Sequence, residues 1–121
     1  MAKNYENLEV WRETIKLATL IYGETKNFPK GELYGLTSQL RRAVISISSN
    51  IAEGAGRSSK QEFYRFINIA LGSLNETENL LYLSKELNYL KKKNFDSLKA
   101  QIEKVGNLLG GFKKYLNKSR M

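Results

Sequence analysis

The sequence of 121 residues contains no cysteine, no histidine and only one proline. Without cysteine there can be no disulfide, no thiol nucleophile and no cysteine-based zinc or iron–sulfur site. Without histidine the chain lacks the commonest general base and the commonest metal ligand, and a Ser-His-Asp triad is impossible. We therefore expect a protein that is not an enzyme and that carries no metal and no cofactor.

The composition is that of one folded domain. Hydrophobic residues make up 41% of the chain and charged residues 26%, which separates it from disordered sequences. The length suits a single domain over residues 1–121. Acidic residues interrupt the N-terminal segment before any apolar run, and the longest apolar stretches are too short to span a bilayer. We therefore expect a cytoplasmic protein that does not associate with membranes.

The net charge of +8 is concentrated in the last quarter of the sequence. Residues 91–121 contain nine basic and two acidic side chains, whereas residues 31–90 contain six of each. Basic clusters attract nucleic acid because binding releases counterions from the phosphate backbone, although a lysine-rich helix can also be an ordinary solvated surface. The predicted nucleic-acid-binding residues are Arg41, Arg42, Arg57, Lys60, Arg65, Lys91, Lys92, Lys93, Lys104, Lys114 and Lys118.

Apolar residues recur every three or four positions in four segments, and this spacing predicts four amphipathic helices. The first helix is expected over residues 7–26, and residues 27–31 break it because they contain the proline and a glycine. The second helix is expected from Leu33, with its end marked by the glycines of residues 54–56.

The third and fourth helices have recognisable starting signals. Ser59 and Glu62 fit a capping box, and the apolar pattern that follows continues to residues 87–90. Asn94 is the candidate cap of the fourth helix, whose apolar seam covers residues 95–116. Four helices of this length with short connections predict an all-α fold, an antiparallel up-down-up-down four-helix bundle.

Several glycines lie inside the predicted third and fourth helices, where each costs about 1 kcal/mol relative to alanine. We interpret them as places where two helices approach closely, since no strand precedes them as it would in a phosphate-binding loop. These glycines are Gly72, Gly106, Gly110 and Gly111.

The second predicted helix has two faces that are suited to burial. One face carries large aliphatic side chains for the bundle core, and the opposite face carries small residues and one isoleucine. Such a face favours close helix contact, so we predict that it lies between subunits of a homo-oligomer. An exposed isoleucine among hydroxyl groups is the alternative. The predicted interface residues are Ser38, Ile45, Ser49 and Ala52.

A polar stretch precedes the turn between the second and third predicted helices. Asn50 lies close to the apolar face, so its amide needs hydrogen-bond partners. Glu53 lies within reach of the third helix or of an arginine, but one carboxylate without a base or a second acid is weak evidence for catalysis. We interpret Asn50, Glu53 and Gly54 as a structural motif at this corner, with a ligand site as the alternative.

Four arginines are open to two interpretations. Their planar guanidinium groups suit bidentate recognition of a phosphate, which would make them an anion-binding cluster. They can equally form ion pairs with acidic residues of the bundle, and the sequence favours neither interpretation. The arginines are Arg41, Arg42, Arg57 and Arg65, and the acidic residues are Glu53, Glu62, Glu76 and Glu78.

Two stretches of the sequence carry a family resemblance. They are Gln39-Leu40-Arg41-Arg42-Ala43 and Ser46-Ile47-Ser48-Ser49-Asn50-Ile51-Ala52-Glu53-Gly54, with shorter matches at residues 8–11, 28–29 and 70–76. With these motifs the chain resembles the bacterial four-helix bundle family encoded by intervening sequences in 23S ribosomal RNA genes. Many members of that family have proline where this chain has Ser48, so we expect a straighter second helix here.

The resemblance implies a bundle fold but no structural role in the ribosome. The related accessory variability determinants of diversity-generating retroelements form basic pentameric barrels that bind nucleic acid and partner a reverse transcriptase. The resemblance therefore implies a homo-oligomer, with a pentamer favoured. Arg41, Arg42, Asn50, Glu53 and Gly54 match the family motif, which leaves open whether they bind a ligand or build the fold.

Our leading hypothesis is a non-enzymatic, oligomeric four-helix bundle that binds RNA or DNA non-specifically through clustered lysines and arginines. Five copies of a +8 chain would form a ring of about +40 and would bind with strong avidity. The alternative is a protein-interaction scaffold or accessory subunit, for example to a reverse transcriptase or a ribosome-associated factor, with incidental nucleic-acid affinity. A third hypothesis, a helical ribonuclease that relies on a histidine, is disfavoured because the chain has none, and a product with no partner is a further alternative.

Overall fold

The computed structural model describes the backbone of residues 2–120 and the side chains of residues 5–118. The chain forms four long helices and two short 3-10 helices. The long helices are α1 (Glu9–Thr25), α2 (Leu36–Ala55), α3 (Lys60–Glu86) and α4 (Lys92–Arg120), and the short ones are η1 (Ala2–Asn7) and η2 (Lys30–Glu32).

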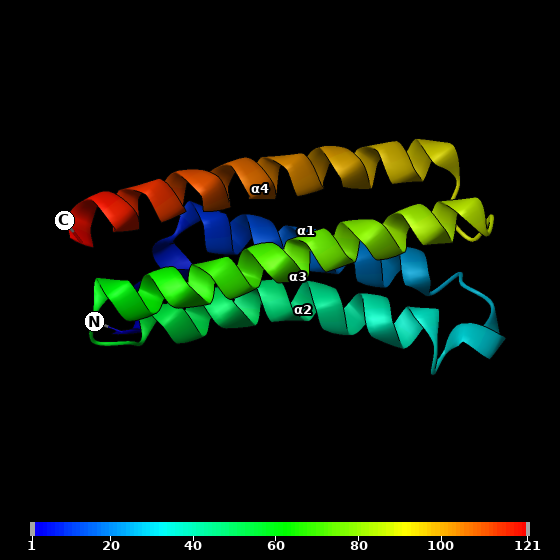
Figure 1. The fold of residues 1–121 in the computed structure, drawn as a ribbon. Coiled ribbons are helices and arrows are strands. Elements are labelled where there is room, and N and C mark those ends of the chain that lie inside the picture. Colours follow the sequence, from blue (N-terminus) through cyan, green and yellow to red (C-terminus); the bar gives the residue numbers. More distant parts are fainter. Residues whose placement is uncertain (1, 121) are drawn as a thin grey trace.

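The four helices form a ring of antiparallel neighbours (Figure 1). α1 packs against α2 and α4, and α3 packs against the same two helices from the other side. This confirms the predicted all-α, up-down-up-down bundle. None of the described helices combines the length and the hydropathy that crossing a membrane would require.

One apolar core runs along the inside of the bundle. Each helix contributes aliphatic side chains with no solvent exposure, because the spacing of three and four residues places them on one face. Burial of each such side chain stabilises the fold by about 1.5–3 kcal/mol. The fully buried side chains include Leu17, Ile21, Leu40, Val44, Ile47, Ile51, Ile67, Val105 and Leu109.

The start of α2 differs from the prediction. The helix begins at Leu36 rather than Leu33, and Leu33 is half exposed. The reason is a side-chain cap: the Leu36 N–H donates to the Glu32 carboxylate at 3.0 Å, and the Tyr89 hydroxyl donates to the same group at 2.9 Å. A Cβ atom on Gly35 would lie 2.8 Å from this carboxylate, so a side chain at that position would displace the carboxylate from its capping position.

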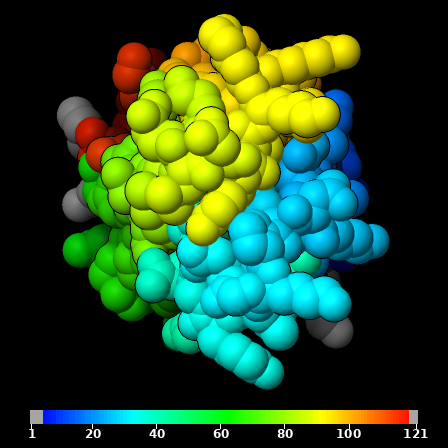
Figure 2. Space-filling view, turned by 90° about the vertical axis from the view of Figure 1, so that its right-hand side faces the viewer, coloured from blue at the N-terminus to red at the C-terminus, as the bar shows by residue number. Residues whose placement is uncertain are grey.

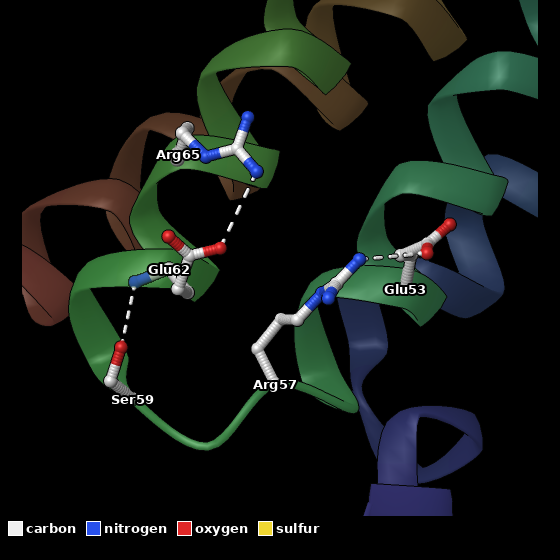
Figure 3. Close-up of polar contacts among 5 residues, drawn as sticks. All are labelled: Glu53, Arg57, Ser59, Glu62 and Arg65. Carbon is white, nitrogen blue, oxygen red and sulfur yellow. Dashed lines mark hydrogen bonds and ion pairs between the residues drawn. The ribbon is translucent and has the colours of Figure 1, made fainter.

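The capping box predicted at the start of α3 consists of two hydrogen bonds, and one of them is formed. The Ser59 hydroxyl accepts a hydrogen bond from the Glu62 N–H at 3.1 Å, as a capping box requires. The Glu62 carboxylate, in contrast, lies 3.4 Å from the Arg65 guanidinium (Figure 3). Ser59 therefore caps the helix, while Glu62 stabilises its first turn through an ion pair one turn away.

The end of α3 is set by the backbone. Asn88 has a φ of 64°, its N–H donates to the Lys85 carbonyl, and the Tyr89 N–H donates to the Ser84 carbonyl. This is a Schellman motif with asparagine in the left-handed position. The next helix then begins at Lys92, and the prediction that Asn94 caps it is wrong. The Asn94 amide instead donates to the Glu24 carboxylate at 3.2 Å, which ties α4 to α1.

Candidate nucleic-acid interface

The corner between α2 and α3 is closed by tight packing. A Cβ atom on Gly54 would lie 2.7 Å from Phe63 Cδ1 and 2.8 Å from Phe66 Cβ. Real Cβ atoms essentially never come this close to other atoms, so a side chain at this position would force the two helices apart. Gly54 is thus the glycine that allows the closest helix approach in this corner.

Of the four glycines predicted to allow close helix approach, only Gly106 faces a neighbouring helix, and the predictions for Gly72, Gly110 and Gly111 are wrong. A Cβ atom on Gly72, Gly110 or Gly111 would meet nothing within 4 Å, and one on Gly106 would make only ordinary contact with Leu74. The prediction failed because helical periodicity does not reveal which glycines face a neighbouring helix and which face solvent.

Polar residues connect α2 to α3 one turn before Gly54. The Asn50 amide donates to the Ser46 carbonyl at 2.8 Å and to the Ser46 hydroxyl at 3.0 Å. The Ser46 hydroxyl in turn lies 2.8 Å from the Ser73 hydroxyl on α3. Every buried polar side-chain atom in the described part of the chain has a partner, so this network carries no unsatisfied group.

Two arginines at this corner are engaged in surface ion pairs (Figure 3). The Arg57 guanidinium lies 2.9 Å from the Glu53 carboxylate, and the Arg65 guanidinium lies 3.4 Å from the Glu62 carboxylate. Both guanidinium groups also lie 4.8 Å from the Phe66 ring centroid. Exposed pairs of this kind contribute at most about 1 kcal/mol, but they neutralise the two charges locally.

The remaining two arginines lie elsewhere on α2. Arg41 joins α2 to α1, because its Nε donates to the Thr25 hydroxyl at 2.9 Å and its guanidinium lies 4.6 Å from the Tyr22 ring centroid. Arg42 is exposed and lines a polar groove between α2 and α3 together with Glu76. The four arginines therefore do not form one anion-binding cluster.

The lysines of the last quarter are spread along α4 instead of forming one patch. The helix has 29 residues, so residues 93 and 113 lie about 30 Å apart. Between them, Lys99 lies 3.2 Å from Glu78 and 3.1 Å from Glu103. Hydrogen bonds to Glu103 and Glu78 raise the pKa of Lys99 above its ordinary value, so this charge is used within the bundle.

Lys104 is similarly occupied, because its ammonium lies 3.4 Å from the Glu13 carboxylate. The Gln101 amide also donates to this carboxylate at 2.8 Å. The hydrogen bond from Gln101, followed by the charge of Lys104, lowers the pKa of Glu13. Lys104 thus joins α4 to α1, although it is one of the predicted nucleic-acid-binding residues.

The corner lysines, Lys91, Lys92 and Lys93, lie at the turn between α3 and α4. All three are exposed, and the long side chains of this segment (yellow) stand out from the end of the bundle in Figure 2. Lys92 lies 2.8 Å from the Asp96 carboxylate one turn further along the helix.

The opposite end of α4 carries what we name the lysine–tyrosine surface. The Lys60 ammonium lies 5.5 Å from the Tyr115 ring centroid, and the Lys113 ammonium lies 5.7 Å from the Tyr64 ring centroid. The Tyr115 side chain is 54% exposed and its ring stacks on the Phe112 ring at 5.8 Å. The members of this surface are Lys60, Tyr64, Lys113, Lys114, Tyr115 and Lys118.

The lysines of this surface differ from Lys92, Lys99 and Lys104, each of which has a carboxylate partner. The last 17 residues of the sequence contain four basic and no acidic side chains. Among the described residues, no ion pair involves a lysine of this surface. Sequence reasoning found Lys60, Lys114 and Lys118 but missed Lys113 and Tyr115. The sequence does contain a pattern that could have identified both residues, namely a tyrosine directly after two lysines in a segment without acidic residues.

The predicted oligomer face lies on the outside of α2. Ile45 is 42% exposed and Ser49 is exposed, while Ser38 and Ala52 are partly buried. Ile69 on the neighbouring helix α3 is exposed to a similar extent, 41%. The described residues contain no group of three acidic side chains that could hold a metal ion.

The chain matches one protein-family model and is similar to solved structures of helical proteins. The model of the 23S rRNA-intervening sequence protein family matches residues 6–111. A crystal structure from Bacteroides thetaiotaomicron, of a protein with unknown function from the S23 ribosomal protein family, has a TM-score of 0.80 and 25% sequence identity. That match covers 94% of this chain and 99% of the other. No curated protein matches.

Proposed function

Since the chain belongs to the 23S rRNA-intervening sequence protein family, we propose that it is a non-enzymatic protein that binds RNA or DNA through its lysine–tyrosine surface. The observation that carries this proposal is a group of lysines that form no ion pair with any described residue, three of which lie in a segment without acidic residues. Ammonium groups of this kind are free to exchange their counterions for phosphates, which is the main source of non-specific affinity.

The proposed interface positions phosphates and does not read bases. Lysine contacts to phosphate oxygens carry no sequence information, so the proposal includes little sequence preference. The role is binding rather than catalysis, because the chain has no histidine and no cysteine to serve as a base or nucleophile. RNA and DNA that can be bound without sequence preference are both present in the cytoplasm, where we expect the protein to act.

The proposal also includes a homo-oligomer, with a pentamer favoured by the family resemblance. Exposed Ile45 among small residues on α2, with exposed Ile69 on α3, supports a contact between copies. Several copies would present several weak lysine–tyrosine surfaces to one strand, and the effective concentration of the second surface would be high. Oligomer formation would thereby convert weak binding at each surface into strong overall binding.

A salt titration tests nucleic-acid binding. The affinity for a labelled mixed-sequence oligonucleotide should fall by about 50- to 150-fold between 50 and 200 mM salt if four phosphates are contacted. A scrambled oligonucleotide of the same length should bind equally well. Absence of binding at the lower salt, or equal affinity at both, would contradict the proposal.

Sedimentation tests the oligomer separately. The protein should sediment as a multiple of 13.9 kDa. Ile45→Glu should shift it toward the monomer, whereas Ile15→Glu, at an exposed isoleucine of α1, should not. A monomer at all concentrations would rule out the interface.

The alternative function, an accessory subunit for another protein, is favoured by the polar groove beside Arg42 and Glu76. This groove has a volume of about 400 Å³, and the side chains of Arg42 and Glu76 are both exposed. Neither side chain forms an ion pair with a described residue. A partner protein recovered with the chain after nuclease treatment would support this alternative, and loss of all partners on nuclease treatment would contradict it.

A further inference from the structure

A groove beside the lysine–tyrosine surface has a different chemical character from the lysines. It lies between the start of α1 and the second half of α4 and has a volume of about 340 Å³. Its walls are mainly apolar, from Leu8, Val10, Leu108, Phe112 and Tyr115, with Gly111 between them. Its volume is near the lower limit for small-molecule sites, about 300 Å³, so it holds one flat ring system but not a helix.

Tyr115 belongs to both features. Its ring forms a wall of the groove, while the Lys60 ammonium lies 5.5 Å from its centroid on the basic side. Phe112 stacks against it with ring planes 25° apart and itself packs edge-to-face on Phe63 at 5.0 Å. Tyr115 is therefore held in place by the core while more than half of its side chain remains exposed.

We propose that this groove takes an unstacked nucleobase of single-stranded RNA or DNA, with the base on Tyr115 and the flanking phosphates on the lysines. The inference rests on the proposed function and names the form of nucleic acid that the surface prefers. In a duplex the bases are paired and stacked on one another, so they cannot enter the groove. In a single strand each base has a free aromatic face, and stacking on a tyrosine adds affinity with little dependence on sequence.

The charges around the groove give the strand an orientation. Glu9 lies at the α1 side of the groove, where its carboxylate repels phosphate, and Lys114 and Lys118 lie on α4. The phosphates should therefore follow α4 and α3, with the base turned toward α1. Asn107 also lines the groove, and its amide both donates and accepts, so it can bond to the edge of any base. This charge pattern favours a strand over an uncharged ligand.

Gly111 offers a way to fill the groove without damaging the fold. A Cβ atom on Gly111 would meet nothing within 4 Å, so a leucine there would project into the groove and away from the protein's own atoms. Gly23 on α1 is a matched control, because it is exposed, its Cβ would also meet nothing within 4 Å, and it does not line the groove.

The experiment measures the affinity of a fluorescein-labelled DNA oligonucleotide of mixed sequence, single-stranded and in a duplex. The unaltered protein should prefer the single strand. Tyr115→Ser and Gly111→Leu should each weaken single-strand binding by between about fivefold and 150-fold, the range for loss of one stacked base, while duplex binding changes by less than about twofold. Tyr115→Phe and Gly23→Leu should bind the single strand as the unaltered protein does.

The outcomes separate this inference from the function it rests on. If neither form of DNA binds the unaltered protein, the proposed function is wrong and the inference falls with it. If both forms bind equally and Tyr115→Ser has no effect, binding stands and the nucleobase site is wrong. If Gly111→Leu changes the sedimentation coefficient but not single-strand binding, the groove joins two copies of the chain, and the inference is again overturned. Circular dichroism confirms that each variant is folded.

Discussion

The two ends of the bundle both carry lysines and a groove, yet they are built differently. The end with the corner lysines is closed by directed hydrogen bonds, from Leu36 and Tyr89 to the Glu32 carboxylate. The end with the lysine–tyrosine surface is closed by contact between Gly54 and two phenylalanines. The first end has a groove of about 330 Å³ lined by Phe28, Leu33 and Arg41 among others, and the groove beside Tyr115 has about 340 Å³, so size does not distinguish them.

The ends differ in the acidic residues near their exposed aromatic rings. Near the first end, Tyr34 is 93% exposed and packs against no described ring or cation. Tyr82, also near this end, is 42% exposed and packs on the Phe95 ring at 4.9 Å, and the ammonium groups of Lys85 and Lys99 lie 5.7 and 5.9 Å from its centroid. Tyr115 at the second end is stacked on Phe112 and lies in a segment without acidic residues. An exposed ring supported by a second ring and flanked by lysines therefore occurs at both ends, and what is particular to the second end is the segment without acidic residues in which Tyr115 lies.

The largest expected effect tests whether the second end is closely packed at Gly54 on α2 and free of neighbouring atoms at Gly111 on α4. Gly54→Ala should destabilise the protein by about 1–3 kcal/mol, because the new Cβ overlaps Phe63 and Phe66. Gly111→Ala should stabilise it by up to about 1 kcal/mol, because alanine is the better helix former and meets no other atom. Urea denaturation of both variants measures this contrast. Equal effects of the two substitutions would show that the ends of α2 and α4 are packed alike.

A smaller effect tests the backbone at the first end. Asn88→Ala should cost about 1 kcal/mol, because an alanine side chain disfavours the left-handed conformation that ends α3. Asn88→Gly should retain or increase stability, since glycine adopts this conformation freely. The two variants differ by one methyl group, so their denaturation midpoints form a matched pair. An alanine variant as stable as the glycine variant would exclude the Schellman ending.

The smallest effect depends on pH and concerns the carboxylate that caps α2. The hydrogen bond from the Leu36 N–H, followed by that from the Tyr89 hydroxyl, lowers the pKa of Glu32 below its ordinary value of 4.5. The folded state therefore favours the ionised form, and this stabilisation is complete above pH 4.5 and lost as the pH falls through the lowered pKa. Glu32→Gln should lower the Tm at neutral pH but leave it nearly unchanged at strongly acidic pH. A Tm difference that is independent of pH would contradict the cap.

The four helices were predictable from the sequence because each has a continuous apolar seam. The errors occur where distant residues decide the structure. α2 begins at Leu36 because Tyr89, 57 positions away, holds the capping carboxylate of Glu32. Asn94 is not a cap because Glu24, 70 positions away, accepts its hydrogen bond. No local pattern contains such information.

The site was less predictable than the fold. Composition identified the lysine-rich segment, but it could not separate Lys104, which pairs with Glu13, from Lys114 and Lys118. That distinction depends on which face of α4 lies against α1. Tyr115 was missed because an aromatic residue near a helix end is equally compatible with the core, and only its exposure shows otherwise.

The central claim is that the lysines of the lysine–tyrosine surface bind nucleic acid, and that the corner lysines, none of which lies over a described aromatic ring, contribute little. Two triple variants test it with the same change in net charge: Lys113→Gln, Lys114→Gln and Lys118→Gln together, against Lys91→Gln, Lys92→Gln and Lys93→Gln together. The first should weaken single-strand binding by about 100-fold at 0.1 M salt and reduce the salt slope by about 2–3, whereas the second should weaken it by less than about tenfold. Equal losses in the two variants would show that overall charge, and not this surface, determines binding.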